Sequence, residues 1–102
     1  MQEQIMRKLF LGFIHIHILH HSKKEPFYGL WMIDELKEHG YDISAGTLYP
    51  ILHNLEKSGV LKVNNRNVDG KIRKYYSITP MGEEVLIEAR RKAYELFKEI
   101  KE

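Results

Sequence analysis

Cysteine is absent from the 102-residue chain, which excludes disulfide bonds and any metal site built on thiolates. Long apolar runs are also missing, because residues 9–19 are broken by His15 and His17 and are too short to span a bilayer. No signal peptide, internal repeat or low-complexity segment is expected. These absences favour one small domain in a reducing compartment, and a domain of this size gains from a partner chain that completes its core.

Neither sign of charge is in large excess, but the charges are unevenly distributed. Sixteen basic and fourteen acidic side chains give a net charge of +2. Residues 60–78 carry five basic side chains and one acidic side chain, whereas residues 25–59 carry two basic and six acidic ones. A basic segment on a nearly neutral chain is typical of a surface that binds phosphates. A solvated hairpin whose charges only aid solubility has the same composition.

Residues 46–61 form the most informative stretch and predict an amphipathic helix. Ser44 is a suitable N-cap because its hydroxyl can accept a hydrogen bond from a free backbone N–H of the first turn. Gly59 is suited to end the helix since it adopts the left-handed conformation at little cost. The apolar side chains recur at helical spacing and predict a stripe that faces a core; they are Leu48, Ile51, Leu52 and Leu55.

The opposite face of this helix carries small, polar and aromatic side chains. Asn54 can make two hydrogen bonds to an adenine edge, and Lys57 can contact a phosphate or a guanine. Pro50 lies inside the helix and lacks a backbone hydrogen bond, so we expect a bend there. An ordinary surface helix would also turn polar residues outward. The members of this face are Gly46, Thr47, Tyr49, Pro50, His53, Asn54 and Lys57.

A β-hairpin is predicted directly after this helix, over residues 60–78. Leu61 and Val63 alternate with polar residues, and Asp69-Gly70 is a strong signal for a tight turn between two strands. A helix followed by a basic hairpin is typical of a winged helix-turn-helix, in which the helix enters a DNA groove. We therefore predict an α+β fold that is mainly α with a small β-hairpin.

Several short motifs, in matching order and spacing, resemble the PadR family of transcriptional regulators. The similarity covers about residues 8–100, and the combination of Gly-Thr-Leu-Tyr-Pro with Arg-Lys-Tyr-Tyr at this distance is specific. The short tail resembles the members that have a single C-terminal helix. The motifs are Tyr28-Gly29, Gly46-Thr47-Leu48-Tyr49-Pro50, Leu55-Glu56-Lys57-Ser58-Gly59, Arg73-Lys74-Tyr75-Tyr76-Ser77-Ile78-Thr79 and Gly82.

The resemblance implies a homodimeric repressor with a winged helix-turn-helix, often released by a small aromatic or cationic effector. Such a protein binds a palindromic operator on double-stranded DNA, in the cytoplasm and on the nucleoid. Together with the groove helix and the basic hairpin, the resemblance predicts a set of DNA-binding residues. They are Ser44, Gly46, Thr47, Tyr49, Pro50, His53, Asn54, Lys57, Arg66, Lys71, Arg73, Lys74 and Tyr75.

The first and last helices are predicted to pair with a second subunit. The first, over residues 4–21, is apolar on two sides, which is typical of a helix buried on two sides. The last begins with Thr79 as N-cap and Pro80, and its apolar residues follow the spacing of a coiled-coil seam. A last helix folded back on its own domain is the alternative. The predicted dimer interface is Leu9, Phe13, Ile16, Leu86, Ala89, Ala93, Leu96, Phe97 and Ile100.

A second helix is predicted over residues 28–39, with Leu30, Ile33 and Leu36 facing inward. Trp31 lies off this stripe, and we favour an aromatic ring lying over the first helix. By resemblance to family members that bind effectors beside aromatics of the last helix, an effector site would involve Trp31, Tyr94 and Phe97. Packing roles for the latter two are the favoured alternative.

His17, His20 and His21 fall on one side of the first helix. A spacing of four residues between His17 and His21 can hold a transition-metal ion, and titration near neutral pH would suit a pH sensor. No cysteine or acidic residue nearby in the sequence completes a ligand set. We therefore interpret these histidines as polar positions along an interface helix and predict no metal site, with metal binding and pH sensing as alternatives.

Catalytic constellations are not visible in the sequence. We find no nucleophile paired with a base, no glycine-rich phosphate loop and no complete set of metal ligands, so we expect neither enzymatic activity nor a cofactor. A winged helix that docks a protein partner, favoured by the acidic segment 25–59, is the alternative to a DNA-binding regulator. We expect residues 1–79 to form the winged helix domain and residues 80–102 the dimerisation helix, within one compact domain.

Overall fold

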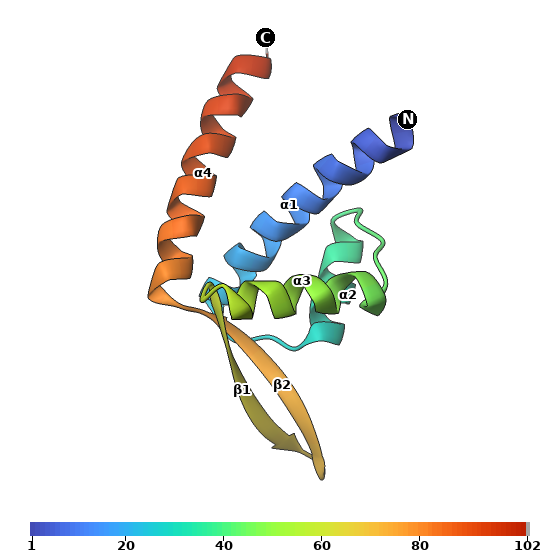
Figure 1. Cartoon of the computed structure of the whole chain (residues 1–102), viewed down its shortest axis with the longest axis vertical. Helices are drawn as coiled ribbons and strands as arrows, with labels where there is room; N and C mark the ends of the chain where they lie inside the picture. The colour runs from blue at the N-terminus through green and yellow to red at the C-terminus, as the bar shows by residue number, and fades with distance from the viewer. Residues whose placement is uncertain (102) are drawn as a thin grey trace.

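Four helices and one antiparallel hairpin make up the computed structural model, which describes residues 1–101 (Figure 1). Residue 102, the end of the predicted dimerisation helix, lies outside the described residues. The α+β fold class is thereby confirmed. In chain order the elements are α1 (Gln2–Lys24), α2 (Gly29–Glu38), α3 (Ala45–Lys57), β1 (Leu61–Val68), β2 (Lys71–Ile78) and α4 (Pro80–Ile100).

Helix α3 forms where its start and stop signals predict it. The Ser44 hydroxyl oxygen accepts a hydrogen bond from the Thr47 backbone N–H at 3.3 Å, which satisfies a free donor of the first turn. Gly59 adopts a φ of +83°, the left-handed conformation that ends the helix. The helix runs unbroken through Pro50, and Leu48 and Leu52 are fully buried. The predicted apolar stripe is therefore the inner face of α3.

The hairpin of β1 and β2 closes through a two-residue turn. Val68 pairs with Lys71, and both Asp69 and Gly70 have positive φ angles of 52° and 83°. Two positive φ angles define a type I′ turn, whose twist matches that of the flanking strands. Leu61 and Tyr76 at the base of the hairpin are buried, whereas its tip is exposed and projects from the helices (Figure 1). We call residues 61–78 the wing.

A short segment between α1 and α2 joins the wing as a third, isolated strand pairing. The backbone of Phe27 exchanges two hydrogen bonds with that of Tyr76, at 3.0 and 2.8 Å. Their rings stack with centroids 5.8 Å apart. This pairing fixes the wing against the start of α2, so the position of the wing relative to α3 is set by buried contacts.

The core lies where α1 crosses the other helices. Buried side chains from α1, α2, α3 and the wing form one cluster. Helix α1 is therefore part of the core of the winged helix domain. A smaller cluster of Leu19, Val60 and Leu86 attaches the start of α4. The main cluster comprises Ile14, Ile18, Phe27, Met32, Leu36, Leu48, Leu52, Leu61 and Tyr76.

The inward face predicted for α2 is wrong at one position. Leu30 is 59% exposed, and Met32 is fully buried in its place. The buried residues Gly29, Met32 and Leu36 recur at spacings of three and four, so the inner stripe begins one residue earlier than the sequence suggested. Helix α1 is also longer than predicted, because it continues to Lys24.

Helix α4 begins as predicted, with Thr79 as N-cap and Pro80 in the first turn. The Thr79 hydroxyl oxygen accepts a hydrogen bond from the Gly82 N–H at 3.0 Å, and the hydroxyl lies within hydrogen-bond distance of the carbonyls of Gly59 and Val60. These contacts bring the first turn of α4 against the backbone that enters β1.

Replacing Gly82 with alanine is expected to destabilise the protein by about 1–3 kcal/mol through overpacking. A Cβ atom at this position would lie 2.3 Å from the Val60 carbonyl oxygen and 2.7 Å from Ile78 Cγ1. Thermal unfolding at one fixed protein concentration measures the change. Gly12→Ala is the matched control, since nothing lies within 4 Å of its added Cβ. Equal melting temperatures for the two variants would contradict the close approach of α4.

Candidate nucleic-acid interface

The outer face of α3 is free of contacts with the core. Gly46, Pro50, His53, Asn54 and Lys57 are all exposed, and they follow one another along the side opposite to Leu48 and Leu52. The fold therefore brings these predicted DNA-binding residues together on one convex face. Ser44 and Thr47 stand at its N-terminal end, where Ser44 caps the helix and Thr47 is half-buried.

Tyr49 differs from its neighbours on this face because its ring turns toward α2. A Cβ atom added to Gly29 would lie 2.3 Å from the Tyr49 hydroxyl oxygen, so the absence of a side chain at Gly29 makes room for the phenol. The Tyr49 side chain keeps 41% of its surface exposed. Its first role is thus to pack α3 on α2, with its edge available on the outer face.

Two arginines of the wing stand directly opposite each other. Arg66 of β1 pairs with Arg73 of β2, an arrangement that is unfavourable for like charges. Each guanidinium lies over an aromatic ring instead of facing the other arginine. Arg66 is 4.2 Å from the centroid of the Tyr75 ring, and Arg73 is 4.1 Å from that of Tyr28.

The two aromatic rings also touch each other and link the arginines into one stack. Tyr28 and Tyr75 meet edge to face with centroids 5.6 Å apart. Cation–π contacts of this kind contribute about 0.5–1 kcal/mol each at exposed sites. They hold both guanidinium groups in fixed places on the wing surface. Sequence reasoning did not include Tyr28 in the site, although it stands in the Tyr28-Gly29 motif.

The two remaining predicted wing cations lie on different faces. Lys71 follows the turn and shares a face with Arg66 and Arg73, whereas Lys74 points to the other face of the hairpin. Lys74 there lines a hollow of about 250 Å³ between the wing and the start of α2. This hollow is also lined by Leu30, Tyr49 and Ile72, so it connects the wing to the base of α3.

The basic side chains of the wing are available to an anion. Within residues 1–101, the ion pairs join His21 and His39 to Glu35, Lys23 to Glu83, and Arg91 to Glu88. None of the five basic wing residues takes part in them. A row of cations without acidic partners, beside an exposed polar helix face, is chemically suited to a phosphate backbone.

Exposed apolar side chains gather on α1 and on the C-terminal part of α4. Both helices rise from the core and diverge toward the end opposite the wing (Figure 1). From residue 90 onward every described residue is exposed, including Leu96, Phe97 and Ile100 at 53%, 59% and 65%. On α1, Leu9 and Phe13 are 49% and 46% exposed. The first part of α4 packs on its own domain, whereas its C-terminal part, from residue 90 onward, does not fold back on it.

The other residues predicted for the dimer interface differ in exposure. Leu86 is buried in its own chain against Leu19 and Val60, so it serves the core of its own domain. Ile16 and Ala89 are half-buried, and Ala93 is exposed. A groove of about 380 Å³ runs between α1 and α4, and Phe13, Ile16 and Ala93 line it.

The predicted effector residues are not brought together on one surface. Trp31 packs over α1 as favoured, with its ring 5.5 Å from that of His21, and it also stacks on Phe27 at 6.2 Å. It lines a cavity of about 240 Å³ beneath the arginine–tyrosine stack. Tyr94 and Phe97 lie exposed on α4 and do not line that cavity.

Comparisons with known proteins agree with this geometry. Residues 18–88 match the family described as the transcriptional regulator PadR-like family. Transcriptional regulator Rv3488 of Mycobacterium tuberculosis is 44% identical over 95 residues, which are 93% of this chain and 89% of that protein. No helix within residues 1–101 has the length and apolar character to cross a membrane.

Solved structures of two regulators resemble the whole fold. A PadR family transcriptional regulator from Eggerthella lenta is 33% identical with a TM-score of 0.84, over 96% of this chain and 87% of that one. A Streptococcus transcriptional regulator is 30% identical with a TM-score of 0.83, over 91% of this chain and 93% of that one. The arrangement of helices and wing is therefore shared across nearly the full length of these proteins.

Proposed function

The chain belongs to the PadR-like family of transcriptional regulators, and we propose that it acts as a homodimeric repressor that binds a palindromic operator on double-stranded DNA. The observation that carries this proposal is the unpaired row of wing cations beside the exposed face of α3. Phosphate contacts supply affinity and position, whereas side chains in the groove supply sequence preference. We propose that the cell compartment is the cytoplasm, with the protein on the nucleoid.

Helix α3 would enter the major groove with its polar face toward the bases. Asn54 and Lys57 are exposed side chains able to make base contacts, and His53 lies beside them. Gly46 and Pro50 carry no long side chain, so they allow the helix backbone to approach the groove closely. Arg66, Lys71, Arg73 and Lys74 of the wing would hold the flanking phosphates, with Tyr75 keeping Arg66 in place.

A second copy of the chain would cover the apolar surface of α1 and α4. Helix α4 has 21 residues, and its exposed C-terminal half would be marginal as an isolated helix in water. Leu96 and Ile100 of each subunit would pack together, while the small Ala93 allows close approach. In this proposal residues 1–79 form the DNA-binding domain and residues 80–102 the dimerisation helix.

By its membership of the family, we propose that the protein is released from DNA by a small aromatic or cationic effector. Trp31 lines a cavity directly under the arginine–tyrosine stack, where a bound compound would displace a wing cation. Tyr94 and Phe97 would meet an effector only at the dimer interface.

Replacing Lys71 with alanine is expected to weaken binding to every DNA sequence by a similar factor. Lys71 is exposed beside the turn of the wing, and a dimer carries two copies. The slope of the logarithm of affinity against that of salt concentration should become shallower by about two, one for each copy. Affinities measured over a salt series, on a specific and a random duplex, give both quantities.

Lys101→Ala is the matched control, because it removes an exposed lysine from the end of the molecule opposite the wing (Figure 1). It should leave the salt slope as in the unmodified protein. Equal salt slopes for the unmodified protein, Lys71→Ala and Lys101→Ala would contradict the placement of the wing on the phosphates. Absence of any salt-dependent DNA affinity would favour the docking of a protein partner instead.

A further inference from the structure

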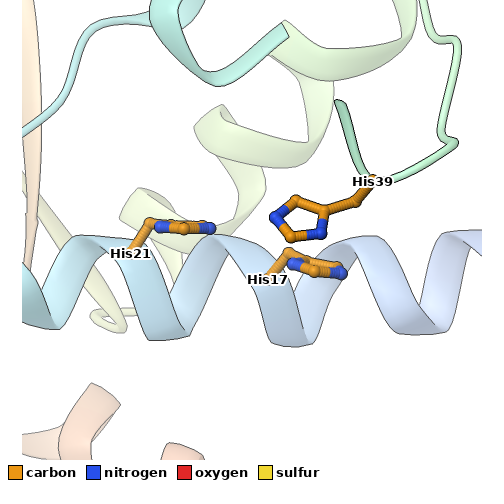
Figure 2. Close-up of side chains that lie close together, drawn as sticks. All are labelled: His17, His21 and His39. Atoms are coloured by element: carbon orange, nitrogen blue, oxygen red, sulfur yellow. The ribbon is translucent and has the colours of Figure 1, made fainter. Parts of the chain in front are cut away.

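Three histidines, two from α1 and one that follows the last residue of α2, lie close together (Figure 2). His17 and His21 lie one turn apart on α1, and His39 ends α2 above them. One nitrogen atom of each ring lies within 4.8 Å of the other two. His20, which the sequence grouped with His17 and His21, is exposed and is not part of this trio. His39 takes its place because α2 packs against α1 and so brings its C-terminal end beside His17.

A carboxylate stands next to two of these three rings. The Glu35 Oε2 atom is 3.1 Å from His39 Nε2 and 3.4 Å from His21 Nε2. The side chains of His21 and Glu35 are only 12% and 22% exposed, so these groups meet in a partly shielded place. This neighbour could not be predicted from the sequence, since Glu35 is 14 positions beyond His21 and reaches it only through the packing of α2 on α1.

One nitrogen of this group has an unmet bonding capacity. His21 Nε2 is buried and has no hydrogen-bond partner among the described residues, because its contact with Glu35 lacks the alignment of a hydrogen bond. An imidazole whose buried, unpartnered nitrogen lies beside a carboxylate and two further imidazoles is placed as a metal ligand would be.

We propose that His17, His21, His39 and Glu35 bind one divalent transition-metal ion of the zinc class. Three imidazole nitrogens and one carboxylate oxygen make a tetrahedral set that zinc favours. Ligands about 2.05 Å from the ion stand about 3.3 Å apart in a tetrahedron, so the nitrogens need to close by about 1.5 Å at most. Small side-chain rotations supply this, since His39 is half exposed.

The ion would act as a structural cross-link. Four protein ligands leave no open position for a substrate, so the site is of the closed kind. It joins the middle of α1 to the last turn of α2, directly before the connection that leads into α3. Metal binding would thus stabilise the junction between the α1 face and the helix-turn-helix.

Calorimetric titration of chelator-treated protein with zinc chloride tests the proposal. We expect one zinc ion per chain, and we expect His17→Ala, His39→Ala and Glu35→Gln each to weaken binding by at least about tenfold, the minimum seen when a supporting group of a metal site is removed. His20→Ala is the matched control, because His20 is an exposed histidine of the same turn whose ring touches that of His21 at 5.0 Å between centroids but is not one of the three clustered rings. Its affinity should equal that of the unmodified protein.

Thermal unfolding provides a second measurement. It compares each protein with and without zinc, so a change in the stability of a variant itself does not affect the result. Zinc in excess of its dissociation constant should raise the melting temperature of the unmodified protein and of His20→Ala, and leave that of His39→Ala unchanged. His39 is 47% exposed, so its replacement leaves the core intact, and far-ultraviolet circular dichroism checks this. Unaltered zinc affinity in all cluster variants, or a loss confined to His20→Ala, would overturn the proposal. The assay contains no DNA, so its failure would leave the regulator function untouched.

Discussion

Replacing Leu96 with aspartate is expected to convert the proposed dimer into monomers and to weaken operator binding by about 10²- to 10⁴-fold, the gain that joining two binding modules provides. Leu96 is 53% exposed on α4, and in the proposed dimer the partner chain covers it. A carboxylate in that seam would be buried without a partner, which is strongly unfavourable. Sedimentation measures the oligomeric state, and titration with a palindromic duplex measures the affinity.

The matched control for this change is Lys98→Asp. Lys98 lies on the opposite side of α4 and contacts Tyr94 of its own chain. Its replacement shifts the charge further toward negative than Leu96→Asp does, so a purely electrostatic effect on DNA binding would be larger in the control. Full operator affinity for a monomeric Leu96→Asp protein would contradict the role of α4. Retained secondary structure in both variants excludes unfolding as the cause.

Replacing Asn54 with alanine is expected to erase the preference for one base pair in each half-site. A bidentate contact of this kind discriminates against the wrong base by about 1–3 kcal/mol, and the dimer carries it twice. Affinity for the operator should therefore fall by about 30-fold or more, while affinity for random DNA stays the same. Selection of bound duplexes from a random pool, before and after the change, reads the preference directly.

Asn65→Ala provides the control of the same chemistry on the wing. Asn65 is exposed on β1 and pairs with Lys74, so in the proposed complex it would lie near the phosphates and away from the base edges. The base preferences of this variant should match those of the unmodified protein. If the Asn54→Ala protein selects the same sequence as the unmodified protein, Asn54 does not contact the bases. A different face of α3 would then have to enter the groove.

Local signals were enough to predict α3 and the wing. The N-cap at Ser44, the left-handed Gly59 and the Asp69-Gly70 turn each act within a few residues, so their effect is visible in the sequence. The burial of Met32 in place of Leu30 was missed because both residues flank the apolar stripe that contains Ile33 and Leu36, one on each side. Only the position of α1 decides between them.

Contacts between distant segments could not be predicted. The stack of Arg66 and Arg73 on Tyr75 and Tyr28 requires both the hairpin register and the pairing of Phe27 with the wing. The histidine cluster forms only because α2 packs against α1. The sequence therefore grouped His20 with His17 and His21, whereas the structure brings His39 to them. Leu86 was assigned to the seam because its spacing fits, although the close packing at Gly82 turns the first part of α4 inward.

Sequencing of the genomic fragments that the purified protein retains at about 0.15 M salt tests the central claim most directly, because non-specific phosphate contacts are weakened there. Our account predicts a few enriched sites that share an inverted repeat, with half-sites about 34–36 Å apart, one turn of the double helix. Retention of all sequences alike, or of none, would contradict a dimer that reads its operator through α3.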